Sequence, residues 1–132
     1  MLELLTQLFN NPNREAKRLN RDAPTIIDSA IRSFPLHRVR DIALMTLESL
    51  AEARAHLDKH EQSRDQMLDR FQQLHGEAKQ RMDQVALTAY TLIIIRLRAE
   101  ALGDIADPAG EAIDEFIGKW AHAVADKQSA SI

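Results

Sequence analysis

Two histidines one helical turn apart are the first residues in this sequence that could do chemistry. His56 and His60 stand at i and i+4, and Glu52 precedes them by one turn, so a helix would project all three from one side. Imidazoles at this spacing can hold a divalent metal ion. No further ligand lies nearby in the sequence, and the Glu-x-x-His spacing of di-metal bundles does not occur. We therefore predict a solvated helix face, with no metal and no cofactor. The remaining histidines are isolated and are expected at helix ends or on the surface: His37, His75 and His122.

A cluster of acidic residues lies around the start of the last predicted helix: Asp104, Asp107, Glu111, Asp114 and Glu115. Clustered carboxylates can bind a hard cation such as Ca²⁺. The spacing here is not that of an EF-hand loop. Acidic side chains in the first turn of a helix also interact favourably with the helix dipole. The cluster therefore predicts a helix start and not a cation site.

Basic residues gather near the beginning of the chain. Residues 1–40 carry seven basic and four acidic side chains, although the whole chain has a net charge of −3 and a pI near 5.9. A low pI and few aromatic residues are not typical of nucleic-acid-binding domains. A helix-turn-helix over residues 23–40 would also lack the usual glycine in its turn. Nucleic-acid binding is therefore an alternative and not the main hypothesis, and it would rest on Arg14, Lys17, Arg18, Arg21, Arg38 and Arg40.

The sequence contains no motif of an enzyme active site that we can identify. A glycine-rich phosphate loop, a Gly-x-Ser-x-Gly elbow and a His-Glu-x-x-His pattern are all absent. Without cysteine there are no disulfides and no thiolate chemistry, which fits a reducing compartment. The first residues lack a basic leader and include Glu3. We expect a cytoplasmic, non-enzymatic protein.

The element that should organise the fold is the apolar stretch 82–102. Its β-branched residues locally favour a strand, but its flanks are strong helix formers with no turn residue between. With no polar face, this stretch must be covered on most sides. We predict the central helix of an all-α bundle. A membrane span is not expected, because Arg96 and Arg98 end the uncharged run after about half of the ~20 residues needed.

Several shorter helices are expected before this stretch. Leu2, Leu5 and Phe9 lie on one stripe of a helix over 2–9. Asn11 is then placed to cap a new helix with Pro12 as its first residue. The mostly charged segment 13–21 predicts a weak helix, and 1–22 a mobile N-terminal arm. Pro24 should restart the chain in a second amphipathic helix that Pro35 ends, with its stripe at Ile26, Ile27, Ala30, Ile31 and Phe34.

Residues 36–74 contain neither glycine nor proline. We favour one continuous helix with a weakly apolar middle, and the alternative is a break near 58–65. Gly76 is the best candidate for the following turn, so 36–74 and 77–102 should form an antiparallel hairpin. A helix that runs on through Gly76 is the alternative, at a cost of about 1 kcal/mol.

The last helix should begin with Asp107 as N-cap and Pro108 as its first residue. Residues 127–132 read as a disordered tail. The face that docks should carry Ile113, Phe116, Ile117, Trp120 and Val124.

We therefore predict a single all-α domain, a bundle of four to five helices with a long helical hairpin. The longer arm of that hairpin would extend beyond the shorter one and expose apolar side chains, and such patches rarely persist on monomers. We predict a homodimer, and a non-enzymatic interaction module such as an adaptor, small chaperone or regulator. A bundle that binds a metal or a small apolar ligand is a further alternative. The predicted partner-binding residues are Leu36, Val39, Ile42, Ala43, Met45, Leu47 and Leu50.

Overall fold

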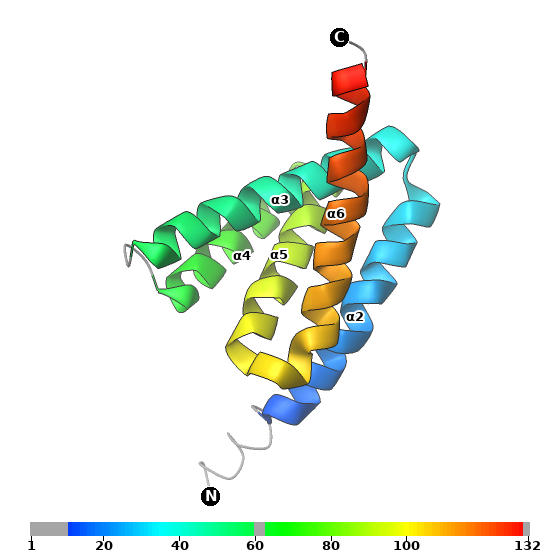
Figure 1. Ribbon diagram of the computed structural model, residues 1–132. Helices are drawn as coiled ribbons and strands as arrows, with labels where there is room; N and C mark the ends of the chain where they lie inside the picture. The colour runs from blue at the N-terminus through cyan, green and yellow to red at the C-terminus, as the bar shows by residue number, and fades with distance from the viewer. Residues whose placement is uncertain (1–10, 60–62, 131–132) are drawn as a thin grey trace, which may run out of the picture.

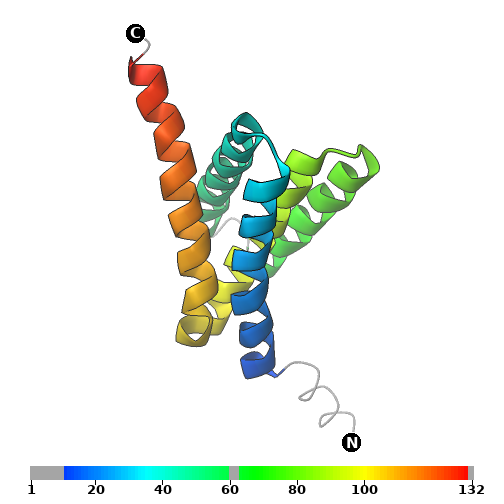
Figure 2. The same ribbon diagram turned by 90° about the vertical axis from the view of Figure 1, so that its right-hand side faces the viewer.

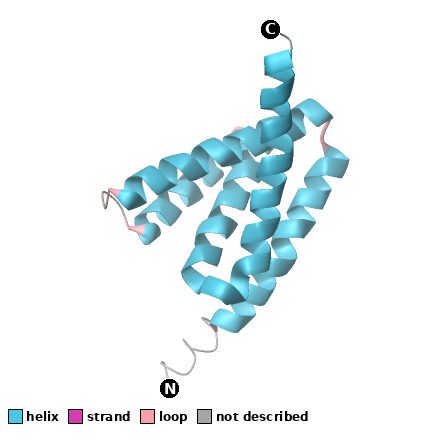
Figure 3. Ribbon diagram, in the orientation of Figure 1, coloured by secondary structure: helices cyan, strands magenta, loops and turns pink. Residues whose placement is uncertain are grey.

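The computed structural model describes residues 11–59 and 63–130, and past Ala121 it describes only the backbone. Within these ranges the chain is helical, with no strand (Figures 1 and 3). The predicted all-α bundle is confirmed. Its elements are α2 (Pro12–Ser33), α3 (Leu36–Asp58), α4 (Arg64–Gln80), α5 (Gln84–Leu102), the 3₁₀ helix η1 (Gly103–Ala106) and α6 (Asp107–Ala130).

Helix α5 is the central element, as predicted. It packs against α2, α3, α4 and α6, and Figures 1 and 2 show it among them. Burial on so many sides explains why β-branched residues are accommodated in a helix, because tertiary packing outweighs local strand preference. Asp83 caps the helix by accepting a hydrogen bond from the Ala86 amide. The buried side chains are Val85, Ala86, Ala89, Leu92, Ile93, Ile95, Leu97 and Ala99.

Helix α2 corrects two predictions. Asn11 caps it and Pro12 begins it, as expected, but the helix runs through Pro24 without restarting. A proline inside a helix costs about 3 kcal/mol, and burial of one continuous stripe against the bundle offsets that cost. Because this stripe begins within 12–22, the segment is packed and is not a free arm. The stripe consists of Ala16, Leu19, Ala23, Ile27 and Ala30. The predicted helix 2–9 lies outside the described residues.

The predicted long helix 36–74 is wrong, and the break near 58–65 is what the structure shows. Helix α3 ends at Asp58, and Ser63 begins α4 with a capping box. The Ser63 hydroxyl accepts from the Gln66 amide at 3.2 Å, and the Gln66 side chain accepts from the Ser63 amide at 2.8 Å. The Ser-x-x-Gln pattern is a recognised helix start, and it was missed in the sequence.

The turn predicted at Gly76 lies instead at 81–83. Gly76 is inside α4, and Met82 takes the left-handed conformation, with φ of +58°. The Asp83 amide donates to the Ala78 carbonyl and the Met82 amide to the Lys79 carbonyl, which is the nested pattern of a Schellman motif. A helical hairpin is therefore present, but its two arms are α4 and α5.

Helix α6 begins at Asp107, one residue before the predicted start at Pro108, and without the predicted cap. Asp107 is itself helical (φ −54°, ψ −41°), because η1 leads directly into α6. The Asn20 side chain of α2 instead accepts from the Ala109 amide at 2.9 Å and donates to the Ile105 carbonyl at 2.9 Å. The backbone is helical to Ala130, and the predicted disordered tail over 127–132 stays a prediction. No helix within 11–59 and 63–130 combines the length and apolar character that a membrane span requires.

Candidate functional site

The predicted partner-binding patch is mostly internal core. Val39, Ile42, Ala43 and Leu50 are buried, and Met45 is half-buried. Because α3 ends at Asp58, the predicted long arm does not form, and α3 packs against α5 and α6. Only two of the seven side chains are exposed: Leu36 at 59% and Leu47 at 42%.

A second surface, which we call the apolar groove, lies between α2 and α6. It has a volume of about 230 Å³. The groove combines side chains from two stripes that the sequence predicted separately, so only the packing of α2 against α6 creates it. Its apolar walls are Pro24, Ile27 and Ile31 from α2 and Ala112, Phe116 and Trp120 from α6.

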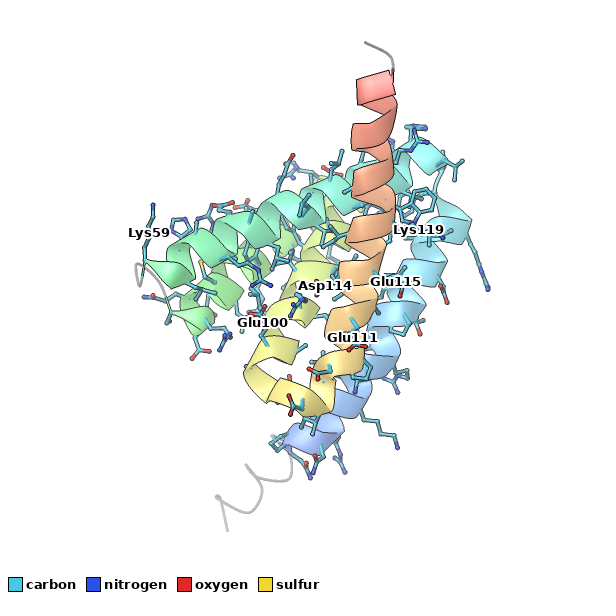
Figure 4. All side chains as sticks on the ribbon, in the orientation of Figure 1. Lys59, Glu100, Glu111, Asp114, Glu115 and Lys119 are labelled. Atoms are coloured by element: carbon cyan, nitrogen blue, oxygen red, sulfur yellow. The ribbon has the colours of Figure 1, made fainter. Side chains whose placement is uncertain are left out.

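Three charged side chains form the rim of this groove: Asp28 from α2, and Glu115 and Lys119 from α6. All three are exposed. Figure 4 shows Glu115 and Lys119 one turn apart along α6. Within the described residues none of the three belongs to an ion pair. The rim therefore carries charges of both signs that no described residue neutralises.

Trp120 gives the groove an unusual polar atom. Its side chain is half-buried, and its indole nitrogen is enclosed without a hydrogen-bond acceptor. Buried donors in native proteins are nearly always paired, so an unpaired one calls for an explanation. Trp120 is the sole tryptophan of the chain, and it is therefore also a natural probe of this surface.

A larger hollow, which we call the charged cleft, lies where α3, α4, α5 and α6 approach one another. It has a volume of about 630 Å³. Arg96 is only 14% exposed and donates from Nε and Nη2 to both carboxylate oxygens of Asp114, at 3.1 and 3.2 Å. This bidentate geometry is the strongest form of an arginine–carboxylate contact.

Glu100 is the second centre of the cleft. Its carboxylate lies 3.1 Å from Arg96, 3.2 Å from Arg54 and 3.8 Å from Arg64. Three guanidinium groups from three helices thus meet one glutamate that is 21% exposed. Figure 4 shows Glu100 and Asp114 on neighbouring helices. Charge pairs across the cleft therefore link α3, α4, α5 and α6.

The predicted acidic cluster is divided between the two regions. Asp114 binds Arg96 in the cleft, whereas Glu115 stands at the rim of the groove. Three further acids line the cleft without an ion pair in the described chain: Asp104, Asp107 and Glu111. These carboxylates would repel a negatively charged ligand, and Arg54, Arg64 and Arg96 each already pair with a carboxylate. The charged cleft is therefore better explained as a network of ion pairs that stabilises the fold than as a ligand-binding site.

The histidines do not form a chemical site in the described residues. Glu52 pairs with Arg70 of α4, His56 is half-buried, and His60 lies outside the described residues. No group of three potential metal ligands is found within the described ranges. His75 corrects its prediction, because it lies inside α4 and its Nε2 is 3.1 Å from the Thr91 hydroxyl of α5.

The basic residues of α2 are brought together on its exposed surface. Arg14, Lys17, Arg18 and Arg21 are all exposed. Arg18 pairs with Glu15 at 3.7 Å and Arg21 with Asp22 at 3.1 Å. Arg38 pairs with Asp41 on α3, and Arg40 is half-buried there. The six predicted residues therefore do not form one surface.

Comparisons of this chain with protein-family models, with curated proteins and with solved structures found no match.

Proposed function

We propose that this chain is a non-enzymatic protein-interaction module that acts as a homo-oligomer, most simply a homodimer, in the cytoplasm. The observation that carries the proposal is the apolar groove, with Trp120 in its wall and unpaired charges on its rim. Tryptophan is strongly enriched among the residues that dominate protein–protein binding energy. An apolar centre surrounded by charged residues is the usual anatomy of such an interface.

The charged cleft supports this choice by contrast. Its arginines and two of its carboxylates bind one another, so a ligand there would have to displace contacts that already exist. At the groove a partner would displace no ion pair. Its volume of about 230 Å³ is below the 300–1,000 Å³ typical of small-molecule sites. A protein side chain is therefore a better occupant than a free metabolite.

Sedimentation equilibrium across the micromolar range tests the proposal. A homodimer has about twice the chain mass of 14.9 kDa. We expect the apparent mass to rise toward that value with concentration. A single species near 14.9 kDa at every concentration would contradict the proposal.

A second candidate function is nucleic-acid binding by α2. It is favoured by the exposure of Arg14, Lys17, Arg18 and Arg21 on one helix. Phosphate contacts make binding strongly salt-dependent, so retention on a DNA or RNA column that is lost at high salt would support it. A Lys17→Glu variant should then elute at lower salt, with Lys59→Glu at the end of α3 as the matched control.

A further inference from the structure

We infer that the apolar groove is occupied by a second copy of this chain, related by a two-fold axis, so that the α2–α6 edges of the two protomers face each other. The inference rests on the proposed function and adds to it the arrangement of the two protomers and the residues that pair between them. It makes Glu115, Lys119 and Trp120 contact residues between protomers.

The distribution of charge on the rim is the first argument. In a two-fold interface each residue faces a different residue of the partner, and the relation is reciprocal. Glu115 and Lys119 are four residues apart on α6. An axis that crosses α6 midway between them makes the two α6 helices antiparallel. Lys119 of each protomer then stands level with Glu115 of its partner, which gives two equivalent ion pairs.

The second argument is that these charged side chains make no ion pair with any described residue of their own chain. Glu115 and Lys119 have the i, i+4 spacing that allows a pair within one helix, yet they make no such pair here. Asp28 on the opposite wall is also without an ion pair in the part of the chain that the structure describes. A partner lysine at this level can therefore reach carboxylates from both walls. A surface with a single sign of charge would instead have repelled its own copy.

The shape of the molecule is the third argument. Figures 1 and 2 show α6 continuing beyond the end of α2 in both views. Helix α2 therefore does not cover α6 along its whole length. A second α6 can lie beside α6, with the half-buried Ala112 and Trp120 of each protomer at the contact.

A charge-reversal experiment tests the inference on the full chain. Lys119→Glu and Glu115→Lys are each made, and sedimentation equilibrium is run on each variant alone and on an equimolar mixture. Each variant alone places like charges opposite each other twice, so we expect dimerisation at least about tenfold weaker. In the mixture, the carboxylate introduced at position 119 of one variant faces the ammonium introduced at position 115 of the other, and the wild-type affinity should be recovered. Lys59→Glu, far from the groove in Figure 4, should associate as wild type does.

The outcomes separate the inference from the function on which it rests. A wild-type chain that never dimerises overturns both. A wild-type dimer that neither reversal weakens, or a mixture that stays weak, overturns the inference alone and leaves the groove to a different protein. Circular dichroism checks that each variant folds. If a variant does not, the emission of Trp120 in the wild type decides: it should shift to shorter wavelength as the dimer forms, and an unchanged spectrum overturns the inference.

Discussion

The charged cleft and the apolar groove border the same helix, α6, and differ in whether ion pairs between helices hold them together. At the cleft, Asp114 and Glu100 hold three arginines that come from α3, α4 and α5. At the groove, Glu115 and Lys119 pair with nothing in the described chain, and the Trp120 indole has no acceptor. The cleft also holds three acids that make no ion pair in the described chain, Asp104, Asp107 and Glu111, and the buried Nε of Arg64 has no hydrogen-bond partner there. The two regions therefore differ in that a network of ion pairs joins four helices across the cleft, whereas the groove is apolar between charges that make no ion pair in the described chain.

The largest expected effect is on the free energy of unfolding, and it comes from the buried face of α5, the central helix of the bundle. Ile93 of α5 is fully buried, whereas Ile94 is only half-buried. We expect Ile93→Ala to lower the free energy of unfolding by about 2–5 kcal/mol, because it leaves a cavity in packed core. Ile94→Ala should cost at least about 1 kcal/mol less. Urea denaturation of both variants checks this, and equal losses would contradict the assignment of the inward face of α5.

The next effect tests the cleft as a structural network. Glu100→Gln removes the only carboxylate that Arg54 and Arg64 contact in the described residues. We expect a loss of about 1–3 kcal/mol in the free energy of unfolding, since the arginines are left facing one another. Glu111→Gln on the rim of the cleft should cost less than about 0.5 kcal/mol. If the two variants lose the same stability, the network is not what holds the cleft together.

A smaller effect of opposite sign comes from a position outside both regions. Gly76 lies inside α4, and a Cβ added there would meet nothing within 4 Å. Gly76→Ala should therefore stabilise the chain by about 0.5–1 kcal/mol. The same substitution would be destabilising if Gly76 occupied a left-handed turn. The melting temperature of the variant, against the wild type at equal concentration, decides between the two.

The smallest effect is expected when the substitution made in the cleft, glutamate to glutamine, is made at the groove instead. Glu115→Gln removes a carboxylate that makes no internal ion pair. At a concentration where the chain is monomeric, we expect the free energy of unfolding to change by less than about 0.5 kcal/mol. Dimerisation should weaken at the same time. A loss as large as that of Glu100→Gln would show that the two regions do not differ.

Local signals in the sequence predicted the ends of some helices and missed others. Asn11 with Pro12, and Pro35, bounded α2 correctly because capping and proline effects act within a few residues. Pro24 misled the prediction, since packing against the bundle keeps α2 continuous. Ser63 was readable as a capping box and was overlooked. The left-handed Met82 had no readable signal, because glycine is the usual residue there.

The two candidate regions could be predicted only in part. The stripes with Ile27 and Ile31, and with Phe116 and Trp120, were both apparent as apolar helix faces, but their meeting in one groove depends on the packing of α2 on α6. The Arg96–Glu100 pair is readable as an i, i+4 spacing. Its partners Arg54, Arg64 and Asp114 come from other helices, so no local pattern assembles the cleft.

Hydroxyl-radical footprinting of the wild-type chain, below and above the concentration of half-association, tests the central claim most directly. If the groove is the open surface, oxidation of Trp120 and Ile31 should fall as the dimer forms. Leu57 in the cleft and the exposed Met82 should remain as reactive as before. Protection of Leu57 with no change at Trp120 would contradict the account, because the cleft would then be the surface that meets a partner.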